Sequence, residues 1–209
     1  MTMGARQVCS KLHSMLLLSM VAFTLVVPPP GGFALTFSTI DVPGATHTGA
    51  QDISATGQIV GRYEDARGVV HGFLLDNAPF TTIDVPGAIL DTFACGINAA
   101  GQIVGEFRRG MRIGAAFLLH KGTFTSIDAG DAVLTTASRI SAAGQIVGAY
   151  IDASGAFRGF LLEDSTFATI DVPGAVNTLV QGINATGQLV GVYTDAGGTQ
   201  HGFLSALVD

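Results

Sequence analysis

Short apolar runs alternate with turn residues along the chain at a fixed spacing. The pentapeptide Gly-Gln-Ile-Val-Gly begins at residues 57, 101 and 144, and Gly-Gln-Leu-Val-Gly begins at residue 187. Successive copies start 44, 43 and 43 residues apart. A constant period of this length is typical of repeat architectures, so the chain is best interpreted repeat by repeat.

Each repeat contains four apolar runs, the pattern of antiparallel strands joined by hairpins. In one repeat the first run ends at Ile53, the second and third cover 59–63 and 71–75, and the fourth begins at Phe80. The second and third runs are apolar on both faces, which indicates strands with a neighbouring sheet on either side. Four strands in about 43 residues is the size of a propeller blade. The pattern predicts an all-β, β-propeller-like fold of four tandem four-stranded repeats.

The turns between the second and third runs have a recurring composition. Aspartate opens and glycine closes the segments 65–68, 152–155 and 195–198. Aspartate can accept hydrogen bonds from its own loop, and glycine takes positive φ without steric cost. These segments are therefore predicted to be hairpin turns.

The order of the runs suggests how the domain closes. A fourth-type run begins at Phe37, before the first repeat, whereas the last repeat ends after a third-type run at Phe203. Pairing these two runs would complete a four-bladed ring and remove exposed sheet edges. A linear stack of units and a larger ring of two chains are the alternatives. The expected repeat units lie near 37–79, 80–123, 124–166 and 167–209.

Residues 1–34 have the pattern of a secretory signal peptide. Arg6 and Lys11 precede an apolar run at 15–27, and Gly-Phe-Ala ends at Ala34, where cleavage is expected. The run of 13 residues is shorter than the roughly 20 needed for a membrane span. An uncleaved anchor is the alternative, and only this alternative implies a membrane partner. The sequence predicts a secreted protein, extracellular or periplasmic, with a single repeat domain at 35–209.

Charge and cysteine content narrow the classes of partner. The chain has 16 acidic and 10 basic residues and a net charge of −6, so it has no basic stripe for nucleic acid. Charged residues make up 12% of the chain, about half the usual share. After cleavage only Cys95 would remain, which excludes an internal disulfide.

Several motifs recur together. They are Gly-Ile-Asn at 96–98 and 182–184, the Gly-Gln-Ile-Val-Gly pentapeptide, His-Gly-Phe-Leu at 71–74 and Thr-Ile-Asp-Val-Pro-Gly at 39–44. Over residues 37–204 the chain resembles the bacterial extracellular repeats of the HAF family. The resemblance implies a secreted or surface protein built from tandem β repeats. It brings no established reaction, ligand or catalytic residue with it.

One aspartate per repeat forms the strongest polar regularity: Asp41, Asp84, Asp128 and Asp171. If the fourth strands lay near a common axis, the four carboxylates would suit a hard cation such as calcium. The alternative, which we favour, is that each aspartate accepts backbone hydrogen bonds at its turn. No cofactor is otherwise indicated.

His71 and His201 would lie in neighbouring blades of a closed ring, where they could bind a ligand or metal or share acid-base work with a carboxylate. Ala115 and Arg158 replace them in the other repeats, which favours a packing role. A basic cluster of Arg108, Arg109 and Arg112 could bind an anionic partner, or could be a solvated hairpin tip.

No nucleophile elbow, zinc-protease motif or phosphate-binding loop occurs in the sequence. The leading hypothesis is therefore a secreted or cell-surface binding or structural module with an unknown extracellular ligand. One alternative is a hydrolase or lyase that acts on an extracellular polymer at one end of the ring. Another is a surface repeat that self-associates.

Overall fold

The computed structural model describes residues 23–25, 35–88, 91–109 and 112–205. The chain divides into two units, Met1–Thr39 and Ile40–Asp209. In the first unit, β1 (Phe23–Leu25) pairs antiparallel with β2 (Thr36–Ser38). Most of the predicted signal peptide, with the cleavage site at Ala34, lies outside the described residues. Within the described part of the chain, no helix is long and apolar enough to cross a membrane.

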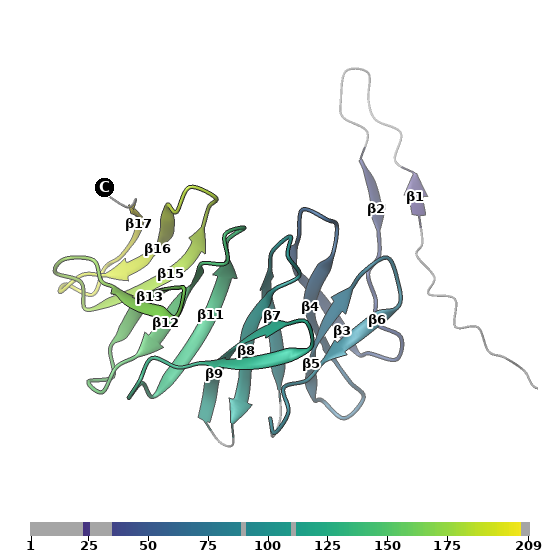
Figure 1. The fold of residues 1–209 in the computed structure, drawn as a ribbon, viewed down its shortest axis with the longest axis horizontal. Helices are drawn as coiled ribbons and strands as arrows, with labels where there is room; N and C mark the ends of the chain where they lie inside the picture. Colours follow the sequence, from purple (N-terminus) through teal and green to yellow (C-terminus); the bar gives the residue numbers. More distant parts are fainter. Residues whose placement is uncertain (1–22, 26–34, 89–90, 110–111, 206–209) are drawn as a thin grey trace, which may run out of the picture. The chain divides into compact units, whose positions relative to one another are not determined.

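The second unit contains four antiparallel sheets, each built from strands consecutive in sequence (Figure 1). The first sheet consists of β3 (His47–Ile53), β4 (Ile59–Glu64), β5 (Val70–Leu75) and β6 (Phe80–Ile83). The second consists of β7 (Thr92–Ile97), β8 (Ile103–Arg109), β9 (Arg112–His120) and β10 (Thr123–Ile127). The third consists of β11 (Leu134–Ile140), β12 (Ile146–Ile151), β13 (Phe157–Glu163) and β14 (Thr166–Ile170). The fourth consists of β15 (Asn177–Ile183), β16 (Leu189–Thr194) and β17 (Gln200–Ser205). The all-β fold of tandem antiparallel repeats is confirmed.

The predicted hairpin turns form as expected. In the first sheet, the carboxylate of Asp65 accepts hydrogen bonds from the backbone N–H groups of Arg67 and Val69, at 2.8 and 3.0 Å. Gly68 closes this turn with φ +80. The turns that begin at Asp152 and Asp195 end in glycines with φ +86 and +84.

The first strand of each later sheet packs against the strands of the preceding sheet, including its two central ones. One phenylalanine and one valine in each of the first three sheets are fully buried: Phe73, Phe117 and Phe160, with Val60, Val104 and Val147. Burying such a side chain contributes about 1.5–3 kcal/mol. The core is therefore made of the same few positions, repeated from sheet to sheet.

The two glycines of each pentapeptide serve different purposes. The first, represented by Gly57, has φ +85 and no atom near the position of an added Cβ, so it is needed for the turn. The second, represented by Gly61, has ordinary φ, but its Cβ would overlap the carbonyl oxygen of Gly49 on the adjacent strand and lie 2.8 Å from the ring of Phe73. The motif thus combines a turn requirement with a packing requirement.

A closed four-bladed ring is not observed. Among the described residues, the fourth sheet has three strands, and β2 pairs with β1 rather than with β17. The sheets follow one another in an arc, and the last does not return to the first (Figure 1). As a result Val190 is 48% exposed, whereas the equivalent valines of the other sheets are buried. The expected pairing of the Phe37 run with the last repeat is not present in this structure, in which β2 pairs with β1 instead.

Candidate functional site

The first sheet carries a chain of polar contacts at one end of its strands. His71 Nδ1 lies 2.8 Å from Asp84 Oδ1, and His71 Nε2 lies 3.7 Å from Asp65 Oδ2. The ring of Tyr63 stacks on the imidazole at 5.0 Å, and its hydroxyl lies 2.9 Å from the hydroxyl of Thr82. One histidine therefore joins the hairpin turn before β5 to the aspartate that follows β6.

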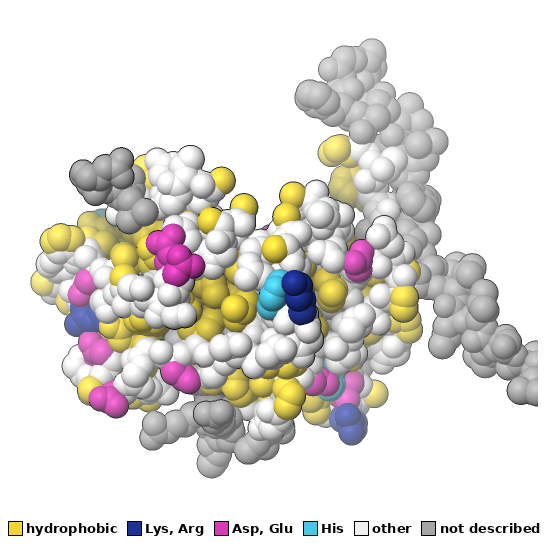
Figure 2. All heavy atoms as spheres, in the orientation of Figure 1, with side chains coloured by type: hydrophobic (Ala, Val, Ile, Leu, Met, Phe, Trp, Pro, Cys, Tyr) yellow, Lys and Arg dark blue, Asp and Glu magenta, His cyan; other side chains and the backbone are white. Residues whose placement is uncertain are grey.

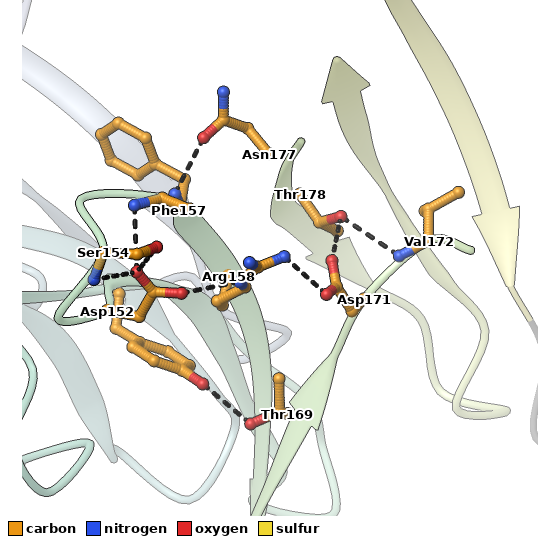
Figure 3. Close-up of polar contacts among 11 residues, drawn as sticks. Asp152, Ser154, Phe157, Arg158, Thr169, Asp171, Val172, Asn177 and Thr178 are labelled. Atoms are coloured by element: carbon orange, nitrogen blue, oxygen red, sulfur yellow. Dashed lines mark hydrogen bonds and ion pairs between the residues drawn. The ribbon is translucent and has the colours of Figure 1, made fainter. Parts of the chain in front are cut away.

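The third sheet repeats this arrangement with arginine in place of histidine (Figure 3). Arg158 donates from Nε to Asp152 at 2.9 Å and from Nη1 to Asp171 at 2.6 Å. Asp171 also accepts a hydrogen bond of 2.9 Å from Thr178, which belongs to the next sheet. Arg158 therefore does the structural work of His71 and links neighbouring sheets through Asp171.

The fourth and second sheets carry reduced versions. His201 Nε2 lies 3.1 Å from Asp195 Oδ2, and the ring of Tyr193 stacks on His201 at 5.0 Å. In the second sheet Ala115 replaces the cation, and Asp128 accepts a hydrogen bond of 2.8 Å from Ser126. The bridge from one basic side chain to two aspartates is thus complete in the first and third sheets. In the fourth sheet the histidine contacts one aspartate, and in the second sheet the basic side chain is absent.

The carboxylates of the hairpin turns are held in the ionised form. The N–H of Val69 is the main cause that lowers the pKa of Asp65, and the N–H of Thr199 does the same for Asp195. The hydroxyl of Ser154, followed by Arg158, lowers the pKa of Asp152. A carboxyl with a lowered pKa is a poor proton donor or acceptor near neutral pH. These contacts favour structure over acid-base catalysis.

The four aspartates proposed for calcium are not gathered by the structure. Asp84 and Asp171 contact His71 and Arg158, Asp128 contacts Ser126, and Asp41 lies before β3. Within the described ranges, no group of three or more His, Cys, Asp or Glu side chains could hold a metal ion. The alternative that we favoured, in which each aspartate accepts backbone hydrogen bonds at its turn, is not seen for Asp84 and Asp171. Their contacts are with side chains. Calcium binding stays a prediction without a ligand cluster to support it.

His71 and His201 lie in the first and last sheets, and each has its own carboxylate partner. They do not face each other across one groove, since these two sheets share no extensive contact. In the basic cluster, Arg108 Nε lies 3.1 Å from Asp91 Oδ2. The side chains of Arg109 and Arg112 lie outside the described residues.

A hollow on the second sheet is a feature that the sequence did not reveal. It has a volume of about 460 Å³ and is lined by Val85, Pro86, Phe107, Phe117 and the residues 122–126. Val85, Phe107 and Phe117 are buried and form its apolar floor, whereas Ser126, which lies opposite Phe117 on β10, is exposed. The hollow thus combines an apolar floor with a hydroxyl group at its rim.

One substitution between repeats accompanies the hollow. Phe107 takes the position that Tyr63, Tyr150 and Tyr193 occupy in the other sheets. Tyr63 and Tyr150 contact threonine hydroxyls, but Phe107 has no hydroxyl, and the corresponding Ser126 donates to Asp128 instead. This single tyrosine-to-phenylalanine difference is the feature of the sequence that could have indicated the hollow.

The visible surface lacks a concentrated charge. On the face shown in Figure 2, acidic side chains are scattered, basic ones are few, and hydrophobic atoms are exposed between polar ones. A scattered distribution of this kind gives no strong field to attract a charged ligand. The surface shown therefore suits a neutral ligand better than a polyanion.

A half-buried glutamate, Glu106, lies on β8 of the second sheet. Burial raises the pKa of Glu106, and the nearby charge of Arg62 opposes this only in part. Arg62 lies over the ring of Phe93, 5.7 Å from its centroid. Burial likewise raises the pKa of the Cys95 thiol to about 12, which makes Cys95 an unreactive packed residue.

Glu106→Gln is expected to raise the melting temperature at neutral pH. The pKa of Glu106 in the folded state is higher than its ordinary value of 4.5. The folded state therefore loses stability relative to the unfolded chain as the pH rises above 4.5. The gain of the variant should grow from pH 4 to pH 8 in thermal melts. Asp131→Asn, at an exposed position, should not show this trend. If the melting temperatures of Glu106→Gln and of the parent changed equally with pH, the prediction would be contradicted.

Comparisons with known proteins leave the family open. No protein-family model and no curated protein matches the chain. Among solved structures, an arginine-to-alanine mutant of AofleA from Arthrobotrys oligospora is 10% identical, with a TM-score of 0.49 over 83% of this chain and 59% of that one. A mutant of the Aleuria aurantia lectin AAL, in complex with Fucalpha1-6GlcNAc, is 12% identical, with a TM-score of 0.38 over 76% of this chain and 64% of that one. At this level of similarity neither structure identifies a ligand for this chain.

Proposed function

We propose that the domain is a secreted or cell-surface binding module and that the hollow on the second sheet binds a neutral carbohydrate. The observation that carries this proposal is the apolar floor with the exposed Ser126 at its rim. Ligand sites are commonly apolar hollows with a few well-placed polar groups. A sugar ring has C–H groups on its face and hydroxyl groups at its edge, so it complements both parts.

The carboxylates favour a binding module over the hydrolase alternative. Glycoside hydrolysis uses a carboxylic acid of raised pKa beside a second carboxylate. Asp65, Asp152 and Asp195 have lowered pKa values instead. Glu106 has a raised pKa because of its burial, but it is not among the residues that line the hollow: it alternates with Phe107 along β8 and so lies on the opposite face of that strand.

The proposal extends to the scaffold and its location. We infer a propeller-like ring of HAF-type repeats, exported with the help of residues 1–34. The support for a ring is that opposite faces of the end sheets are uncovered: Ile53 of the first sheet is 63% exposed, and Leu204 of the fourth is 69% exposed. Covering these faces against each other would remove an aggregation-prone apolar surface. Intact mass after export, expected to begin at Leu35, tests the cleavage, and solution scattering tests the ring.

Ser126→Trp is expected to abolish binding, because Ser126 lies opposite Phe117 on the face of β10 that borders the hollow, and the indole would fill it. Ser126→Ala should weaken it by roughly 3- to 10-fold, the effect of losing one hydrogen bond. Ser126 is exposed, so both variants should fold. Calorimetry with a panel of neutral and acidic oligosaccharides provides the measurement.

Thr125→Trp and Thr125→Ala are the matched controls, since Thr125 is the neighbour of Ser126 but its side chain lies on the opposite face of β10. They should bind like the parent. Absence of binding to every neutral oligosaccharide would contradict the proposal. Release of shorter sugars during the incubation would support the hydrolase alternative instead.

A further inference from the structure

The fourth sheet ends at a strand with one uncovered edge. Within the described residues β17 pairs only with β16, whereas β5, β9 and β13 are each paired on both edges. Such an edge presents unpaired N–H and C=O groups that can accept another strand. The missing strand is the fourth one, which every other sheet possesses.

A segment with the sequence of a fourth strand lies elsewhere in the chain. Residues 36–44 read Thr-Phe-Ser-Thr-Ile-Asp-Val-Pro-Gly, and residues 166–174, which contain β14, read Thr-Phe-Ala-Thr-Ile-Asp-Val-Pro-Gly. The two differ only at Ser38 and Ala168. Their near identity indicates that residues 36–44 are suited to the environment that β14 occupies in the third sheet.

The aromatic contacts of the sheets support the same assignment. In the first three sheets the buried phenylalanine of the third strand contacts a phenylalanine of the fourth: Phe73 with Phe80, Phe117 with Phe124 and Phe160 with Phe167, at 5.4, 5.5 and 4.8 Å. Phe203 holds the equivalent place in β17 but is only half-buried. Phe37, its expected partner, is 63% exposed in β2.

We propose that removal of residues 1–34 frees residues 36–41 to add to the edge of β17 in the same chain, as the fourth strand of the last sheet. The pairing of β5 with β6 sets the register: Gly202 opposite Ile40, Phe203 opposite Thr39, Leu204 opposite Ser38 and Ser205 opposite Phe37. Asp41 then lies beside His201, as Asp84 lies beside His71.

The N-terminal segment controls this addition. In the structure β1 pairs with β2, with Phe23 opposite Ser38 and Leu25 opposite Thr36. Cleavage after Ala34 would remove β1 and free this edge of residues 36–38. Export would thereby be coupled to completion of the last sheet. The inference deepens the ring proposed above, because the added strand continues directly into the first sheet.

Ser38→Cys combined with Leu204→Cys tests the register. In the exported, processed chain the two cysteines should form a disulfide under mild oxidation, since directly paired residues lie within disulfide reach. Ser38→Cys with Gln200→Cys is the control, because Gln200 lies four residues away along β17 and on the same face. The unprocessed chain that retains residues 1–34 should not form the bond. Peptide mapping by mass spectrometry identifies the linked cysteines.

A bond within one chain at monomer mass is the expected result. A bond between two chains would overturn same-chain addition in favour of strand exchange, and its absence from the processed chain would overturn the strand assignment. Scattering that shows a closed ring without this bond would keep the ring and reject only the strand. Binding of oligosaccharides by the hollow is measured separately, so its failure would not affect this result.

A second measurement avoids cysteines. Phe37→Ala should lower the melting temperature of the processed chain by roughly 10 °C, the effect expected for loss of a buried aromatic ring in a domain of this size. In the unprocessed chain, where Phe37 is exposed, the shift should be small. Equal shifts in the two forms would contradict the proposal.

Discussion

Gly105→Ala is expected to unfold the domain. A Cβ at this position would overlap the carbonyl oxygen of Phe93 on the adjacent strand and would lie 2.9 Å from the ring of Phe117. Neither neighbour can move freely, because Phe93 belongs to β7 and Phe117 is buried in the core. We expect a loss of more than about 4 kcal/mol, the size reserved for severe core defects. Far-UV circular dichroism and urea denaturation would measure it.

The matched control lies four residues earlier in the same pentapeptide. Gly101 has φ +72, and the atom nearest to an added Cβ, Gln58 Oε1, is 4.0 Å away. Gly101→Ala should therefore cost only about 1–2 kcal/mol, the price of a left-handed backbone for a residue with a Cβ. Similar losses for the two variants would show that packing does not distinguish the two glycines.

Phe160→Ala is expected to destabilise the domain by about 3–5 kcal/mol. The ring is fully buried and packs against Phe167, with centroids 4.8 Å apart, so truncation leaves a cavity and a lost ring contact. Phe203→Ala is the comparison, because this equivalent ring is only half-buried in the fourth sheet. In the unprocessed chain it should cost clearly less.

Processing changes the expectation for Phe203. If residues 36–41 complete the last sheet, the loss caused by Phe203→Ala in the processed chain should approach that of Phe160→Ala. Urea denaturation of both variants in both forms provides the four values. A Phe203 variant whose loss is the same in both forms would be inconsistent with strand addition.

Local features of the fold could be predicted from sequence because their causes are local. Asp65 and Gly68 specify a turn through a capping carboxylate and a positive φ, and the structure contains both. The strand pattern around Ile53 and Phe80 likewise depends on neighbours that are close in sequence. The candidate site was harder, because its residues come from separate loops and strands. Val85 and Ser126 line one hollow although they are far apart in the sequence.

The roles of repeated polar residues also required the structure. The sequence showed one aspartate per repeat, but only the packing of the strands shows that Asp84 contacts His71 and that Asp171 contacts Arg158 and Thr178. Histidine and arginine occupy one structural position because each can bridge two carboxylates. Arg158 therefore replaces the histidine of the first sheet without loss of its structural function.

The sequence by itself determined the repeat, the strand order within it and the hairpin turns, since these follow from periodicity and from backbone preferences of single residues. Tertiary structure decided which faces are covered, where the hollow forms and which edge of the last sheet is free. These properties depend on contacts between sheets and on strand partners distant in sequence. The pentapeptide contains both kinds of information: Gly101 is required by its own backbone, whereas Gly105 is required by the strand and ring beside it.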